Sequence, residues 1–122
     1  MSRSREFDHI LKTLLSVSTD IEAIALVSED GVMLASALPQ HFEEARVAAL
    51  GSTLLNLGAR AIQELRRGAL EQILISGRDG HVAMNAVGDG TLLMVVTTSH
   101  AKLGLVYMDM AKAAEEIRNV PH

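Results

Sequence analysis

Three Asp-Gly pairs, each set between two apolar runs, constrain the fold of this chain more than any other feature of its sequence. They lie at 30–31, 79–80 and 89–90. Asp-Gly in this setting is the strongest short-range signal for a β-hairpin, because glycine takes a positive φ freely and aspartate tolerates one. The sequence therefore predicts three tight turns and five strands, which cover residues 21–28, 32–38, 70–76, 81–87 and 91–98.

Three other segments carry apolar residues at helical spacing. The first covers residues 5–17. The last follows Ser99, a residue type that caps helices, and runs to Ile117. The longest covers residues 41–67 and, at 1.5 Å per residue, has a length of roughly 40 Å. The predicted order of elements is α-β-β-α-β-β-β-α.

Residue types within two of the strands indicate their places in the sheet. The strand at 91–98 is apolar at every position from Leu92 to Val96, which is typical of a central strand covered on both faces. The strand at 70–76 carries Glu71 and Gln72, which suits an edge. We expect an α/β three-layer sandwich, with a mostly antiparallel five-stranded sheet and helices on both faces.

Composition excludes several classes of function. The chain has 122 residues, 48% of them hydrophobic, and fits one domain over 1–122. A net charge of −4 and very few aromatic residues argue against nucleic-acid binding. The absence of cysteine excludes thiolate chemistry and Cys-ligated zinc. Neither a membrane-spanning run nor a signal peptide is visible, so we expect a cytoplasmic protein without membrane insertion.

The predicted long helix has two unusual faces. One is a wide apolar stripe, which we expect to cover the sheet and which contains Val47, Leu50, Leu54, Leu57, Ala61 and Leu65. The opposite face is made of small, nearly uncharged residues, namely Ala45, Ala48, Ala49, Ser52, Thr53, Asn56, Ala59 and Gln63, with Arg60 the one charge among them. Small residues let a second helix approach closely, so this face predicts a contact with another chain. The alternative is an ordinary exposed face, rich in alanine for its helix propensity.

The edge strand supports the same interpretation. Residues 70–76 form an apolar run without proline, and an exposed edge of this kind is a template for pairing with another chain. Two copies that pair edge to edge would extend the sheet across a twofold axis. The chain is therefore predicted to form a homodimer.

Residues with catalytic potential form no recognisable constellation. The five histidines are far apart and none forms an HxH or HxxxH pair. The Gly-rich segments at 77–80 and 88–90 lead into strands, whereas a phosphate cradle needs a helix N-terminus. Arg66 and Arg67 close the long helix, where they complement its dipole or contact an acidic partner. We predict no catalytic, cofactor or metal site, and no enzyme activity.

Nearly the whole chain, about residues 6–118, resembles the roadblock family of dynein-light-chain-type domains, especially its stand-alone bacterial and archaeal members. The resemblance rests on the order of elements and on four phrases. These are ALVSEDGVMLAS (25–36), AALGSTLLNLGARAIQEL (48–65), GALEQILISGRDGHVAMNAVGDGTLLMVV (68–96) and LGLVYMDMAKAAEEI (103–117). The resemblance implies a profilin-like fold.

The resemblance also implies a function. Family members form dimers by pairing the strand that here is 70–76 and by packing their long helices side by side. They generally lack enzymatic activity, and many are platforms for small Ras-like GTPases, some of which they stimulate. Carried onto this chain, the interface with the sister chain or the GTPase would contain Ala45, Ala48, Ala49, Ser52, Asn56, Ala59, Arg60, Leu70, Gln72 and Leu74.

A second hypothesis is a small-ligand sensor or a general protein-interaction scaffold with the same profilin-like fold. Against the sensor, the predicted interior is aliphatic and offers no converging polar groups to orient a ligand.

Overall fold

The computed structural model describes residues 3–121, and the predicted order of elements is confirmed. The elements are α1 (Arg3–Ser16), β1 (Ile21–Ser28), β2 (Met33–Ala37), α2 (Glu44–Glu64), β3 (Gln72–Gly77), β4 (Gly80–Gly88), β5 (Thr91–Thr98) and α3 (Leu103–Arg118). The helix predicted over 41–67 is shorter at both ends. Ser99 lies in a turn, and Lys102 is the residue before α3, so the predicted serine cap is wrong.

All five strands belong to one antiparallel sheet with the order β2-β1-β5-β4-β3. The prediction of a central strand is confirmed for β5, and the prediction of an edge strand is confirmed for β3. The β4–β5 turn has positive φ at both Asp89 (53°) and Gly90 (69°), as a type I′ turn requires. In the β3–β4 hairpin the turn residues are instead Arg78 and Asp79, and Gly80 opens β4.

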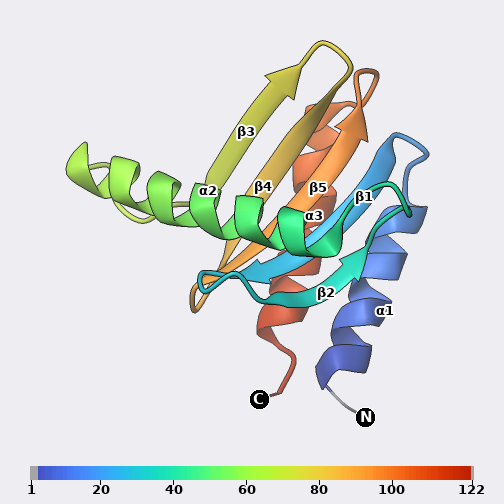
Figure 1. The fold of residues 1–122 in the computed structure, drawn as a ribbon, viewed down its shortest axis with the longest axis horizontal. Coiled ribbons are helices and arrows are strands. Elements are labelled where there is room, and N and C mark those ends of the chain that lie inside the picture. Colours follow the sequence, from blue (N-terminus) through green and yellow to red (C-terminus); the bar gives the residue numbers. More distant parts are fainter. Residues whose placement is uncertain (1–2, 122) are drawn as a thin grey trace.

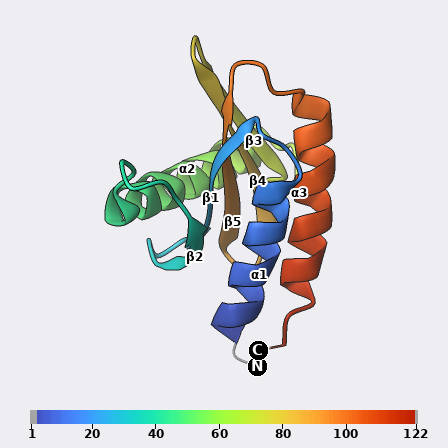
Figure 2. The same ribbon diagram turned by 90° about the vertical axis from the view of Figure 1, so that its right-hand side faces the viewer.

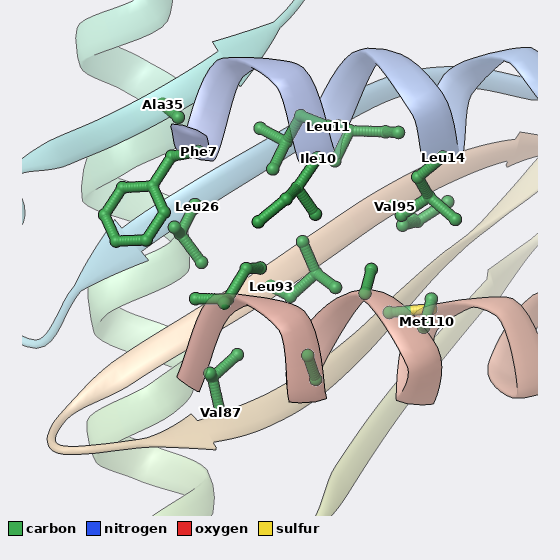
Figure 3. Packing of buried hydrophobic residues seen from close by; sticks show 14 of the residues in the cluster. Phe7, Ile10, Leu11, Leu14, Leu26, Ala35, Val87, Leu93, Val95 and Met110 are labelled. Atoms are coloured by element: carbon green, nitrogen blue, oxygen red, sulfur yellow. The ribbon is translucent and has the colours of Figure 1, made fainter. Parts of the chain in front are cut away.

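The molecule has three layers, with α1 and α3 on one face of the sheet and α2 on the other (Figure 2). The larger core lies between the sheet and the helix pair α1–α3. Phe7 and Leu11 of α1 and Met110 of α3 point into it, toward Leu93 and Val95 of β5 (Figure 3). This core is continuous and apolar, so it supplies most of the burial that stabilises the fold.

A smaller core lies beneath α2. It joins Ala25 and Val27 of β1 to Met94 of β5, and α2 contributes Ala48 and Leu55. The helix crosses the sheet obliquely, and its C-terminal part projects past the edge strand β3 (Figure 1). Only part of α2 therefore packs on the sheet of its own chain.

The first residue of β4 must be glycine, because β5 runs very close to it. A Cβ atom at Gly80 would overlap the carbonyl oxygen of Thr97. Since a backbone atom cannot move aside cheaply, we expect Gly80→Ala to lower the free energy of unfolding by about 1–3 kcal/mol in urea titrations. The matched control is Gly77→Ala across the same turn, where the nearest atom is 3.6 Å away and no comparable loss is expected. Equal stability of the two variants would contradict this account.

Candidate functional site

Exposed apolar side chains, rather than polar clusters, mark the candidate site. Within residues 3–121, no group of three or more His, Cys, Asp or Glu side chains is placed to hold a metal ion. No helix in the described part of the chain is long and apolar enough to cross a membrane. Large apolar side chains are exposed on the long helix and on the edge strand, at Leu50, Leu57, Leu65, Leu74 and Ile75.

Two small residues of α2, Ala48 and Gly51, face the sheet of the same chain. Ala48 and Gly51 are buried, and a Cβ atom at Gly51 would lie 2.7 Å from the sulfur of Met94 and 3.3 Å from Cβ of Val27. These small side chains let the helix approach β1 and β5 closely. Ala48 was predicted to lie in an interface, but it is only 3% exposed and lies under the helix, so that assignment is wrong.

The wide apolar stripe of α2 is largely exposed instead of covering the sheet. Leu50, Leu57 and Leu65 are 56%, 61% and 69% exposed, whereas Val47 and Leu54 are half-buried. The predicted role of this stripe is therefore wrong for its outer members. We call the stripe the apolar flank, and it comprises Val47, Leu50, Leu54, Leu57, Ala61 and Leu65.

The other side of α2 carries the remaining predicted helix positions. We call it the small-residue flank, and it comprises Ala45, Ala49, Ser52, Asn56, Ala59 and Arg60. Ser52 and Ala59 are half-buried and the other four are exposed. The Asn56 amide donates to the carbonyl of Glu29, at 3.0 Å, which ties this flank to the β1–β2 turn. Arg60 pairs with Glu64 at 3.0 Å in an exposed salt bridge that adds little stability.

The predicted strand positions divide between the edge and the smaller core. Gln72 and Leu74 lie on the edge strand and are exposed, Leu74 by 46%. Leu70 precedes β3 and packs with Ile73 against the smaller core. A Cβ atom at Gly58 would lie 2.8 Å from Cδ1 of Ile73, so α2 crosses above β3 at this point. The structure thus brings the helix and the edge strand together.

A hollow extends the apolar flank toward the middle of the sheet. Its volume is about 170 Å³, and every residue that lines it is apolar, among them Val47, Leu50, Val82 and Val96. A small-molecule site would need polar groups to fix the orientation of its ligand, and this lining supplies none. The sequence did not lead us to predict that the apolar flank and the hollow form one continuous surface. A signal for this surface was present in the sequence. The helix α2 has apolar or small residues on nearly every side, and a single face of the sheet cannot bury all of them.

On the opposite face of the sheet, a hydrogen bond from Tyr107 joins α3 to the edge strand β3. The Tyr107 hydroxyl donates to the carbonyl of Ile73 at 2.8 Å. Burial raises the pKa of Tyr107 above its ordinary value, and a hydrogen bond with the backbone of Met84 lowers it by a smaller amount.

This raised pKa predicts a loss of stability at alkaline pH. The folded chain keeps the phenol neutral to a higher pH than the unfolded chain does. The stabilisation that the neutral Tyr107 phenol gives to the folded chain is therefore complete below the ordinary pKa. It is lost as the pH rises through the raised pKa. Tyr107 is the only tyrosine, so phenolate absorbance reports it alone. We expect a higher titration midpoint in the folded than in the denatured chain, and a flatter alkaline stability profile in Tyr107→Phe. Coincident midpoints would refute the prediction.

Comparison with known proteins agrees with this architecture. Residues 7–97 match the Roadblock/LC7 domain. An uncharacterized protein of Methanocaldococcus jannaschii, MJ1340, is 34% identical over 104 residues, which cover 85% of this chain and 90% of the relative. The sequence resemblance to roadblock proteins is thereby confirmed.

Solved structures show the same fold at lower identity. Myxococcus xanthus MglB is similar with a TM-score of 0.88 and 19% identity, covering 96% of this chain and 88% of that one. A Roadblock/LC7 domain from Streptomyces avermitilis has a TM-score of 0.85 and 22% identity, covering 91% and 93%. Schizosaccharomyces pombe profilin has a TM-score of 0.66 and 12% identity over 95% and 99% of the two chains, so the predicted profilin-like fold is confirmed. The chain belongs to the Roadblock/LC7 domain family.

Proposed function

We propose that this chain is a non-enzymatic regulatory or scaffold module that forms a homodimer and binds a small Ras-like GTPase in the cytoplasm. The observation that carries the proposal is the division of α2 into two flanks beside an open edge strand. Large apolar side chains cover one flank, and small, mostly uncharged ones cover the other. Membership of the family supports the GTPase, because the roadblock proteins that this chain resembles often serve as platforms for such partners.

The apolar flank is the surface that we assign to the second copy. Leu50, Leu57 and Leu65 are more than half exposed in the single chain, and burying a leucine side chain contributes about 1.5–3 kcal/mol. The flank reaches β3 where Gly58 crosses above Ile73, so a second copy that pairs with the edge strand meets the same flank. Gln72 and Leu74 belong to this interface.

The small-residue flank is the surface that we assign to the GTPase. It lies on the other side of α2, so it remains exposed when a second copy covers the apolar flank. Ala45 and Ala49 are exposed, and their small side chains let another protein approach the helix backbone closely. Arg60, which pairs with Glu64 in the single chain, adds a guanidinium group that a carboxylate of the partner can also bind.

The proposal is tested by measuring binding to a panel of purified Ras-like GTPases encoded in the same genome. Each GTPase is loaded with GDP or with a non-hydrolysable GTP analogue and titrated with the chain. We expect one of them to bind with affinities that differ at least tenfold between the nucleotides, about 1.4 kcal/mol. A faster GTP hydrolysis rate in that complex identifies a regulator, and an unchanged rate identifies a scaffold. Failure of the whole panel to bind in either state would overturn the GTPase assignment.

A further inference from the structure

A second hollow lies at the end of the sheet where α1 begins, α3 ends and β4 turns into β5. Its volume is about 230 Å³. The start of α1 and the end of α3 lie side by side at this end of the molecule (Figure 2). We call it the end hollow. Its apolar lining belongs to the α1–α3 face of the sheet, and it consists of Phe7, Leu34, Val87 and Ile117.

Two arginines border the end hollow, one on each helix. The guanidinium of Arg3 lies 5.3 Å from the centre of the Phe7 ring. Nη1 of Arg118 donates to the carbonyl of Val87 at 3.0 Å, which fixes this guanidinium and engages only part of its N–H donors. Within residues 3–121, no carboxylate forms an ion pair with Arg118. Guanidinium groups on an apolar wall are well placed to bind a carboxylate.

Asp89 brings an acidic group to the same hollow. The type I′ turn holds this residue at a φ of 53°, so the backbone determines its position. Its carboxylate makes no hydrogen bond or ion pair with any side chain in the described part of the chain. The end hollow therefore offers both signs of charge to a ligand, beside an apolar lining.

From this arrangement we propose that the end hollow binds a free α-amino acid with an apolar side chain. The carboxylate of the ligand binds Arg3 and Arg118, its ammonium group binds Asp89, and its side chain lies against the apolar lining. The volume equals that of about eight water molecules at about 30 Å³ each, which is enough for an amino acid of the size of leucine. A free amino acid fits better than the end of a peptide, because each chain end carries only one of the two charges.

The end hollow differs from the hollow beside α2 in the property that a small-molecule site requires. The hollow beside α2 has an entirely apolar lining, whereas the end hollow combines apolar side chains with a few charged groups that can fix the orientation of a ligand. Its rim is open at Gly88, where a Cβ atom would meet no other atom within 4 Å. The end hollow contains no residue of α2 or β3, so the inference goes beyond the proposed dimer and GTPase contact.

Isothermal titration calorimetry of the unchanged chain tests the proposal. The ligands are leucine, isoleucine, valine and methionine, together with N-acetylleucine, which lacks the ammonium charge, and leucinamide, which lacks the carboxylate. We expect at least one of the four amino acids to bind. Both leucine derivatives and glycine should bind roughly tenfold or more weakly than leucine. Failure of all four amino acids to bind at millimolar concentration overturns the proposal, and so does equal affinity for leucine and its two derivatives.

Two variants assign the charges of the ligand to named residues. Asp89→Asn removes the carboxylate and keeps the turn, because Asn-Gly also favours type I′. Its affinity for leucine should fall roughly tenfold or more, to a value near that for N-acetylleucine. Arg118→Gln should lose the preference for leucine over leucinamide.

Asp79→Asn is the matched control, since it makes the same change of charge in the turn at the other end of β4. It should bind leucine as the unchanged chain does. If Asp89→Asn and Asp79→Asn bind leucine equally, whether tightly or weakly, Asp89 does not hold the ammonium group and the proposal is wrong. A negative result leaves the homodimer and the GTPase contact standing, because neither involves this hollow.

Discussion

The Leu57→Glu variant is expected to be monomeric at concentrations where the unchanged chain is a dimer. Leu57 is 61% exposed in the single chain and lies in the middle of the apolar flank. Burying an unpaired carboxylate costs several kcal/mol, and the twofold axis places one in each half of the interface. The dissociation constant should rise roughly 100-fold or more, because about 1.4 kcal/mol corresponds to tenfold. Sedimentation equilibrium over a dilution series measures the change.

Ala49→Glu is the matched control, since it places the same side chain on the other flank of the same helix. We expect it to remain a dimer, with unchanged helix content by circular dichroism. The opposite result, a dimeric Leu57→Glu and a monomeric Ala49→Glu, would show that the small-residue flank is the dimer seam. That outcome would restore the interface predicted from the sequence.

The same Ala49→Glu variant should lose affinity for the GTPase. A glutamate on the small-residue flank replaces a methyl group with a longer, charged side chain, which obstructs close approach and must be desolvated at the contact. We expect the dissociation constant for the GTPase to rise at least tenfold, about 1.4 kcal/mol, while the dimer persists. Titration of the labelled GTPase with each variant gives both values.

Lys112→Glu controls for the change of charge, because it lowers the net charge by two, against one for Ala49→Glu, and Lys112 is exposed on α3, on the opposite face of the sheet. It should bind the GTPase as the unchanged chain does. If Ala49→Glu binds as tightly as Lys112→Glu, the small-residue flank is not the GTPase surface. If both variants bind weakly, the loss comes from net charge rather than from a local contact.

Local signals in the sequence were sufficient to predict most of the fold. The Asp-Gly pair at 89–90 favours the positive φ that both residues adopt, and a two-residue turn of this type closes a hairpin. The uninterrupted apolar run from Leu92 to Val96 suits only a strand covered on both faces. Ser99 shows the limit of these signals, because α3 begins after Lys102 without any side-chain cap.

The orientation of α2 could not be predicted from the sequence, and the reason is physical. A helical wheel ranks faces by hydrophobicity, and by that measure Leu50 and Leu57 should cover the sheet. The distance at which α2 packs on the sheet determines its orientation instead. Gly51 and Ala48 allow the helix to lie closer to β1 and β5 than leucine would, and this close contact turns the larger side chains outward. Both sides of the helix were recognised, but Leu50, Leu57 and Leu65 are exposed rather than packed on the sheet, and Ala48 is buried under the helix.

The most direct test of the central claim is native mass spectrometry of the chain mixed with the panel of GTPases, each in its GDP and GTP-analogue forms. The account predicts a complex that contains two copies of the chain together with one GTPase species, in a nucleotide-dependent amount. It also predicts that Leu57→Glu removes the second copy. Spectra that contain only single chains and free GTPases, with either nucleotide, would contradict it.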